Sequence, residues 1–521
     1  MRISTTQINL RALNALLKQQ ADVSRTQFQL ASGKRITLPS DDPNGSSRIL
    51  NINESLSITE QYQTNISLVT SRQRLEENVL DSAVDLLQRV KELSIQAANS
   101  THGSQGRNDI SLEIRQRFDE LYNIANTRDA NGEFIFAGFQ GFTQPFTLNS
   151  SGSVDYNGDQ GQRFLQISET RTIADRDPGS DVFQAVTNGN GTFSVKDNAN
   201  NTGGGIIHTG SVIDPSLYDG DSYTLLFGND SDATTANVGA FGFTDVIGTN
   251  DVLTYTLQIN GTTVYSVTDA GTPVTTLQGL ADEINNDSGT TGVSAYVNSG
   301  KLFFTNTSPT STDIQITETF SGFTASDGDS VTSYFGNTLD ENNTSATITL
   351  SNSGAQNYIV MDSDNNIETT GTYSPEQQIS FNGITTSVKG TPNIGDNYTI
   401  TPSAYQDMFQ TLDALADAME PGGATTETNA NNTINRMLLE LDNTINHIVR
   451  IRSGIGARLN SAESQLLINE DFKITLEQSR STIEDLDYAS AITRFEQQLT
   501  GMQAAQQSFA RIQGLSLFNY L

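Results

Sequence analysis

The sequence predicts an α+β multidomain protein in which long terminal α-helices form a coiled-coil or helical-bundle rod, and a central, mainly β region carries a nested β-rich insert. Two observations support this fold class. Apolar residues in 1–141 and 403–521 recur at alternate steps of three and four, whereas 142–402 contain short strand-like runs broken by Gly, Asn, Asp and Thr. Each helical stripe needs partner helices, so the two ends must share one bundle while the centre loops out.

Three helices are expected in the N-terminal region. The first ends at Gly33, which can adopt the left-handed conformation of a C-terminal cap. The second begins at Pro43, with Asp42 as its N-cap, and continues to about Thr101. A shorter helix over residues 110–125 follows a polar loop.

The C-terminal region carries the clearest heptad pattern. Its ladder has steps of four and three and consists of Ile434, Leu438, Leu441, Ile445, Ile448, Ile455, Leu459, Ala462, Leu466 and Leu476. Arg452, Asn469 and Lys473 are its polar positions. We interpret the stripe of residues 434–480 as the internal core face of a helix about 70 Å long.

The heptad phase slips by one residue near 484–487 and then resumes as Tyr488, Ile492, Phe495, Leu499, Met502 and Phe509. A phase change between two stripes is typical of a joint between stacked bundles, so we place a domain boundary near residue 483. Two helices, 1–36 and 488–521, lie beyond this joint. Because two helices cannot cover each other's apolar faces completely, we expect these ends to be mobile in the free monomer and to fold fully on assembly.

The centre is expected to be built mainly from strands. Strands are predicted at 222–227, 253–259, 293–297, 301–305 and 345–350, with one short helix at 277–284. Asn260-Gly261 and Asn382-Gly383 predict hairpin turns. The similar segments 219–225 and 394–400 predict the opening and closing strands of one β domain.

These patterns predict four domains. They are a terminal helical assembly domain (1–40 with 484–521), a helical rod domain (41–141 with 403–483), a β domain (142–230 with 336–402) and a nested insert domain (231–335).

Charge and composition exclude several classes of protein. The net charge is −31 and the pI is near 4.3, which argues against nucleic acid or anionic lipid as the partner because phosphate-binding faces need clustered Lys and Arg. Residues 142–402 alone carry −23, so the centre is a water-facing, self-repelling region. The chain has no cysteine, which removes disulfides and thiolate chemistry. Its first residues do not form a Sec-type signal peptide, and no apolar run is long enough for membrane insertion.

Neither a catalytic site nor a cofactor or metal site is expected. The three histidines, His102, His208 and His447, lie far apart and have no second ligand at a suitable spacing. Acidic turns such as 219–221, 327–329 and 362–367 are expected to be solvated, with weak calcium binding as the alternative. The Ser and Thr residues of the centre leave glycan attachment open.

The terminal regions resemble the bacterial flagellar axial proteins, the flagellin family, in its hook-associated branch. The N-terminal likeness lies in Met1–Thr5, in Ala31–Ile36 followed by Pro39–Pro43, and in Ala125–Thr127 leading to Gly132–Gly138. The ending Leu515–Leu521 looks like that of a junction subunit rather than a filament subunit. Filament flagellins also differ at 38–43, where they tend to carry a Ser-Ala-Lys-Asp-Asp-like block.

The resemblance implies a structural role at the hook-filament junction of the flagellum, in a homo-oligomeric ring beside a neighbouring hook-associated protein and filament flagellin. It also implies type III export without a cleavable signal peptide, a cytosolic export chaperone and an extracellular location. We expect the assembly interface at Leu10, Leu13, Leu17, Phe28, Ile492, Phe495, Leu499, Met502, Phe509, Leu515, Leu517 and Phe518. The alternatives are a filament-forming flagellin and an extracellular adhesin or carbohydrate-binding protein that uses the β centre, with an enzyme a distant third.

Overall fold

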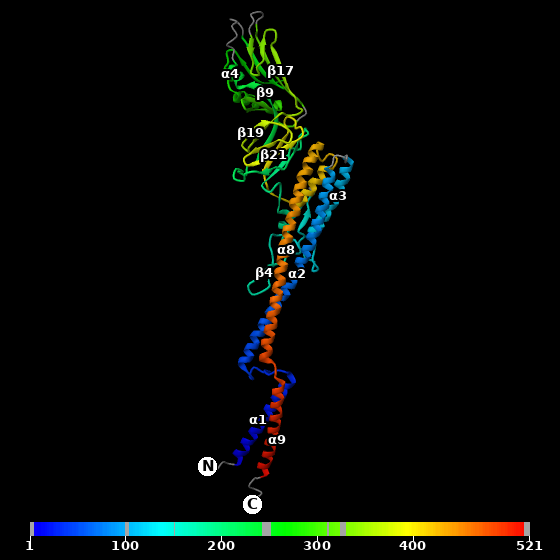
Figure 1. Ribbon diagram of the computed structural model, residues 1–521, viewed down its shortest axis with the longest axis vertical. Helices are drawn as coiled ribbons and strands as arrows, with labels where there is room; N and C mark the ends of the chain where they lie inside the picture. The colour runs from blue at the N-terminus through cyan, green and yellow to red at the C-terminus, as the bar shows by residue number, and fades with distance from the viewer. Residues whose placement is uncertain are drawn as a thin grey trace. The chain divides into compact units, whose positions relative to one another are not determined.

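The computed structural model describes residues 5–98, 104–150, 152–241, 252–309, 312–323 and 330–514. The chain forms two compact units, which we describe separately. Unit 1 comprises 1–74, 163–176 and 454–521, and unit 2 comprises 75–162 and 177–453. The two longest helices, α2 (Pro43–Ala97) and α8 (Glu427–Glu484), contribute residues to both units (Figure 1).

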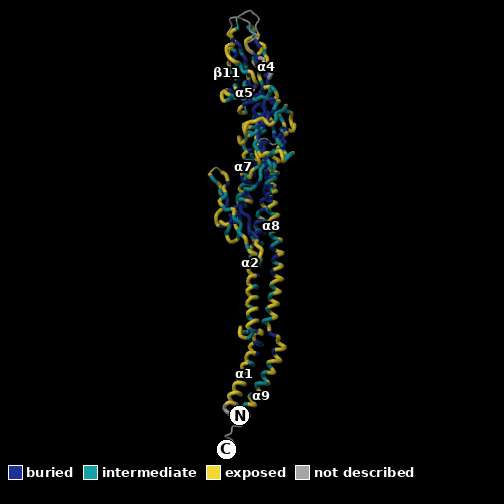
Figure 2. The backbone as a smooth tube through the Cα atoms, turned by 90° about the vertical axis from the view of Figure 1, so that its left-hand side faces the viewer, coloured by how far each residue is buried: buried dark blue, intermediate teal, exposed yellow. Residues whose placement is uncertain are grey.

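The terminal helices of unit 1 are α1 (Thr5–Ser32) and α9 (Tyr488–Gly514), which run side by side (Figure 1). The predicted end of the first helix is confirmed, because Gly33 has φ +71° and its N–H donates to the Gln29 carbonyl at 2.9 Å. The predicted start of the second is also confirmed, since Asp42 Oδ1 accepts from the Gly45 N–H at 2.9 Å. Figure 2 shows that α1 and α9 are largely exposed along their length.

A hairpin of β3 (Phe164–Gln166) and β4 (Thr172–Ala174) packs against α2 and α8 in unit 1. Their shared apolar cluster contains Ile66, Val69, Ile167, Ile173 and Ala462. The hairpin is also hydrogen-bonded to both helices. Asn65 and Gln73 of α2 donate to the carbonyls of Gln166 and Ala174, and Asn469 of α8 donates to the carbonyl of Ile167.

The helical part of unit 2 adds α3 (Ser104–Ala125) and α7 (Met408–Met419), which pack against each other. Within this unit α8 buries Ile434, Leu441 and Ile448 completely, seven residues apart, as the predicted core ladder requires. Helix α3 begins six residues earlier than predicted, so residues 104–106 are helical rather than loop. The extra turn brings Arg107, which is buried, to within 2.9 Å of Glu427.

The β part of unit 2 contains two larger sheets. The first has the order β12-β13-β9-β18-β19, with β22 beside β9 and β6 beside β22. Its strands are β6 (Phe193–Asp197), β9 (Tyr223–Thr234), β12 (Val293–Asn298), β13 (Lys301–Asn306), β18 (Asn357–Met361), β19 (Ile367–Thr372) and β22 (Asn397–Pro402). The second has the order β11-β10-β14-β17, with β10 (Thr254–Ile259), β11 (Thr262–Thr268), β14 (Ile314–Ser321) and β17 (Ser345–Leu350). All pairs in both sheets are antiparallel.

Shorter elements complete unit 2. They are β1 (Phe146–Leu148), β2 (Val154–Tyr156), the π-helix η1 (Ser180–Gln184), β5 (Val186–Thr187), β7 (Ile206–Ile207), β8 (Ser211–Val212), α4 (Thr235–Ala240), α5 (Leu277–Asn286), α6 (Ser288–Thr291), β15 (Ser330–Thr332), β16 (Thr338–Asp340), β20 (Gln378–Phe381), β21 (Ile384–Lys389) and β23 (Tyr405–Gln406). In the part of the chain that the structure describes, no helix is both long and apolar enough to cross a membrane.

The structure contains a strand or helix at each predicted position in the centre. The predicted turns are present as well, with positive φ at Asn260 and Gly261 and at Asn382 and Gly383. The two similar segments form neighbouring strands, since Leu225 of β9 pairs with Tyr398 of β22. However, β9 continues through residues 230 and 231, where a domain boundary is predicted, and its end pairs with β13. One buried core runs through both of the β regions that this boundary would separate. The four-domain division therefore stays a prediction.

Candidate assembly surface

The helix pair α1–α9 is held together by a narrow seam. On α1 the buried or half-buried positions toward α9 follow heptad steps and are Ala12, Leu16, Gln19, Val23, Thr26 and Leu30. On α9 the corresponding positions are Ala491, Phe495, Gln498, Met502, Ala505 and Phe509. Polar groups interrupt the seam, where the Thr26 hydroxyl donates to Gln498 Oε1 at 2.7 Å and Gln19 Nε2 donates to the Gln498 carbonyl at 3.2 Å.

The four residues of α1 that are predicted for the assembly interface lie outside the seam. Leu10, Leu13, Leu17 and Phe28 all lie on the exposed side of the helix, and the Phe28 side chain is 62% exposed. On α9 the predicted ladder divides between two faces. Ile492 is exposed, Leu499 is half-buried, and Phe495, Met502 and Phe509 belong to the seam with α1. The last three predicted interface residues, Leu515, Leu517 and Phe518, lie outside the described residues.

A polar elbow joins the terminal pair to the long helices of unit 1. The connectors of the two chain ends lie against each other, since the Arg35 N–H donates to the Glu484 carbonyl at 2.7 Å and the Leu486 N–H donates to the Gly33 carbonyl at 3.0 Å. The Arg35 guanidinium also donates to the Ile483 carbonyl at 2.7 and 3.1 Å. This contact spans the predicted phase slip, where α8 ends and α9 begins.

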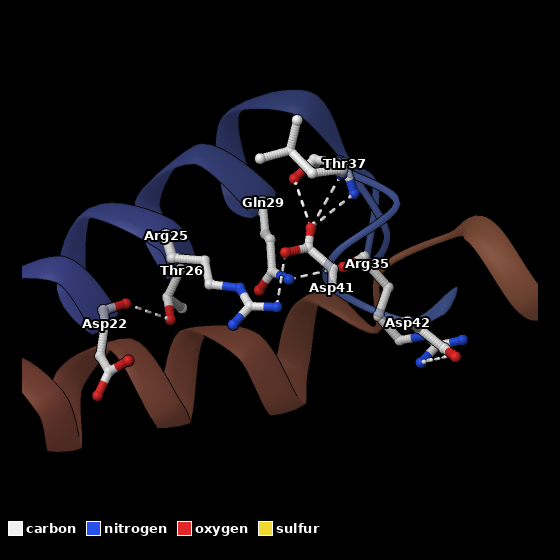
Figure 3. A network of polar contacts seen from close by, with 9 residues as sticks. Asp22, Arg25, Thr26, Gln29, Arg35, Thr37, Asp41 and Asp42 are labelled. Atoms are coloured by element: carbon white, nitrogen blue, oxygen red, sulfur yellow. Dashed lines mark hydrogen bonds and ion pairs between the residues drawn. The ribbon is translucent and has the colours of Figure 1, made fainter. Parts of the chain in front are cut away.

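Asp41 is the centre of the elbow (Figure 3). Its carboxylate accepts hydrogen bonds from the N–H of Leu38 at 3.0 Å, from the N–H and hydroxyl of Thr37 at 3.1 and 2.9 Å, and from Arg25 Nη2 at 2.7 Å. Burial would raise the pKa of Asp41, but the hydrogen bonds from Leu38 and Thr37 together with the charge of Arg25 outweigh it and lower the pKa. The elbow is therefore built around an ionised carboxylate, which joins the connector between α1 and α2 to Arg25 of α1.

The predicted ladder of residues 434–480 lies on the inner face of α8, where its apolar members are buried or half-buried as far as Leu476. Ile455 and Ala462 are fully buried, and Asn469 is buried by its bond to the hairpin. Four apolar side chains that do not belong to the ladder lie on the other flanks of the helix, with Leu467 59%, Ile468 56%, Phe472 51% and Ile474 52% exposed. Among the described residues of unit 1, α2 and the β3–β4 hairpin pack against this part of α8, and the other flanks of the helix stay exposed. The heptad pattern does not predict that these four apolar side chains lie on the surface.

The polar positions of the ladder each have a defined partner. Arg452 pairs with Glu77 at 2.8 Å and Asp81 at 2.7 Å in unit 2, and Lys473 pairs with Glu60 at 2.9 Å in unit 1. These bonds explain why the heptad pattern tolerates charges at core-type positions, because each charge reaches a partner of opposite sign.

The residues considered for chemistry are used in ordinary structural contacts. His447 Nε2 lies 2.7 Å from the Asp181 carbonyl, and Arg450 lies 2.9 Å from its Nδ1. Burial lowers the pKa of His447, so the imidazole is neutral at physiological pH. Asp362 accepts bonds from the N–H groups of Asp364 and Asn366 within its own turn. Among the described residues no group of three His, Cys, Asp or Glu side chains is arranged to hold a metal ion.

Taken together, these features define a class of protein whose two terminal helical regions pair with each other and whose β domains are inserted between them. Family models match the same regions. Residues 3–141 match the bacterial flagellin N-terminal helical region, residues 438–521 match the bacterial flagellin C-terminal helical region, and residues 256–308 match the flagellin hook IN motif. The chain belongs to the flagellin family of bacterial flagellar proteins.

Individual relatives come from the same family. Flagellar hook-associated protein 3 of Salmonella typhimurium strain LT2 is 29% identical over 187 residues, which cover 36% of this chain and 58% of the relative. A flagellin of Salmonella rubislaw is 26% identical over 281 residues, covering 53% of this chain and 51% of that one. The chain thus spans little more than half of the length of either relative.

Solved structures share the fold. The crystal structure of hook-associated protein 3 from Legionella pneumophila has a TM-score of 0.56 and 23% identity, and the likeness covers 84% of this chain and 98% of that one. FlgL of Xanthomonas campestris has a TM-score of 0.54 and 22% identity, covering 82% of this chain and 99% of that one. The predicted fold class is confirmed by these structures.

Proposed function

We propose that this protein is a structural subunit of the bacterial flagellum at the hook-filament junction, where copies form a ring through their terminal helices. The observation that carries the proposal is the apolar side of α1, on which Leu10, Leu13, Leu17 and Phe28 stay exposed although α9 is already in place. Exposed apolar stripes of this length mark surfaces that bind other proteins. The likeness to hook-associated protein 3 supports the junction as the location.

The partners follow from the same proposal. A subunit at this position contacts further copies of itself laterally, a hook-associated neighbour on one side and filament flagellin on the other. Leu515, Leu517 and Phe518 would extend the interface beyond α9. We further propose that the chain reaches the outside of the cell through the flagellar export route, assisted by a cytosolic chaperone. The acidic centre, at −23 for residues 142–402, suits a region that faces water rather than neighbours.

A filament-forming flagellin is the alternative, and the match to a flagellin over 53% of the chain favours considering it. The two functions differ in where the protein lies. We expect an epitope-tagged chain, expressed in cells that lack the native gene, to appear as a single band between hook and filament in immunogold electron microscopy. Label along the whole filament, or long tubes formed by the purified protein alone, would replace the junction function with the filament function.

A further inference from the structure

Helix α8 carries two separate apolar flanks in unit 1. Successive residues of an α-helix are about 100° apart around its axis, which places Ile468 and Phe472 on one flank and Leu467 and Ile474 about 130° away on another. Neither flank is the buried face, which carries Ala462 and the hydrogen-bonded Asn469. The side chains on both flanks are half exposed. One helix therefore offers two different apolar surfaces to the outside.

The first flank is concave. Ile468 and Phe472 line a groove of about 480 Å³ together with residues of α2 and the hairpin. The remaining lining residues are Ser55, Ile58, Thr59, Tyr62, Ser168, Glu169 and Asn469. The side chains that α2 contributes include exposed Ile58 and half-buried Tyr62, so the groove is apolar along both walls. We call the second flank, which carries exposed Leu467 and Ile474, the ridge.

The charges around the two flanks differ. The ridge is bordered by exposed Glu463, Glu470 and Asp471. The groove side carries Glu169 but also Arg171, whose guanidinium is anchored to Ser461 and Gln465 of α8. Two ridges placed together would bring six carboxylates into one contact, whereas a ridge against a groove does not. Electrostatics therefore disfavours a symmetric pairing of ridges.

We propose that the ridge of one copy docks into the groove of the next copy, and that this contact closes the ring laterally. A ring needs a heterologous interface, in which two different patches of each subunit meet. The groove and the ridge supply one such pair on a single rigid helix. This inference rests on the proposed function and identifies a second copy of this chain as the partner for unit 1, at a surface distinct from the exposed stripe of α1.

The absence of cysteine makes a direct test possible. Cells that lack the native gene would express the full chain with Ser55→Cys in the groove, with Glu470→Cys beside the ridge, or with both. Isolated flagella would be treated with a short bis-maleimide. We expect dimers and higher multimers only from the double variant, because each cross-link needs one cysteine from each flank. Cross-linked dimers from either single variant would indicate a symmetric contact and overturn the proposal.

The same experiment separates the two levels of inference. If all three variants lie at the junction, and their thiols react with a monofunctional maleimide, but the double variant gives no multimer, the groove–ridge contact is wrong while the junction function stands. Loss of the junction location in every strain, including wild type, would refute the proposed function itself.

Charge substitutions give an independent measurement. Ile468→Asp in the groove and Ile474→Asp on the ridge should each reduce the number of filaments per cell at least tenfold, whereas the equally exposed Ile213→Asp in unit 2 should not. The thermal midpoint of each purified monomer should stay close to that of wild type, because the replaced side chains are exposed in the free chain. Normal filament numbers in both flank variants would overturn the proposal.

Discussion

Replacing Phe28 by Asp should stop assembly without unfolding the monomer. Phe28 lies on the outer side of α1, 62% exposed, so only a neighbouring subunit can bury most of its ring. Burying a whole Phe side chain contributes about 1.5–3 kcal/mol, so burying the exposed part of Phe28 in the subunit contact contributes about 1–2 kcal/mol. An unpaired carboxylate buried in its place costs several kcal/mol more. Because about 1.4 kcal/mol changes affinity tenfold, the contact should weaken by at least about a hundredfold.

The matched control is Val23→Asp, five residues earlier on the same helix. Val23 is buried in the seam with α9, so a carboxylate there should separate the two helices in the monomer. The assays are circular dichroism and hydrogen exchange of both purified monomers, with filament counts from strains that carry each variant. We expect unchanged protection of α1 in Phe28→Asp, lost protection in Val23→Asp, and no filaments in either strain. Wild-type filament numbers in Phe28→Asp, or a loss of helix in its monomer, would refute the assignment of this face to assembly.

Three further predictions concern the monomer. Leu441→Ala, at a fully buried position, should cost about 2–5 kcal/mol and lower the thermal midpoint of unit 2 by roughly 5–20 °C, whereas Val449→Ala, at an exposed position of the same helix in unit 2, should change it by no more than a degree or two. Calorimetry distinguishes the two, and equal shifts would contradict the described burial. Because the folded pKa of Asp41 lies below its usual 3.8, the ionised carboxylate stabilises the elbow above about that pH and this contribution is lost as the pH falls through the lower, folded pKa. The midpoint difference between wild type and Asp41→Asn should therefore shrink in acid, and a difference that grows would show the sign to be wrong. Limited proteolysis should trim α1 and α9 first, because the α1–α9 seam is narrow and contains the polar residues Gln19, Thr26 and Gln498. Protease-resistant ends in a demonstrated monomer would disprove this prediction.

Much of the helical framework could be predicted because heptads leave few alternatives. Ile434, Leu441 and Ile448 repeat every seven residues, and Gly33 and Pro43 mark a helix end and a helix start that local backbone chemistry favours. The face of α1 that pairs with α9 is harder to predict. This helix has one stripe through Leu16 and Val23 and another through Leu17 and Phe28, and only the complementary shape of α9 decides which of them is covered.

The boundary predicted at residue 231 shows a different limit. The predicted boundary falls between Asp230 and Ser231, and both residues lie inside β9. The carboxylate of Asp230 accepts bonds from Asn298 at 3.0 Å and Asn357 at 2.6 Å, so the sheet satisfies a side chain that would otherwise favour a turn. Polar partners distant in sequence can thus stabilise a strand that local propensity disfavours. Such partners cannot be predicted from the residues next to the strand.

The hydrogen bonds of the β3–β4 hairpin have a mechanical consequence. The backbone carbonyls of Gln166 and Ala174 accept hydrogen bonds from α2, and the carbonyl of Ile167 accepts one from α8. The hairpin therefore fixes the axial position of each helix. A helix that slid along its axis by one residue, about 1.5 Å, would pull an amide away from its only matching carbonyl. Hydrophobic heptads alone would also permit a slip by a whole repeat, because leucine packs similarly seven residues further on. In unit 1 the hairpin therefore opposes axial sliding of α2 against α8.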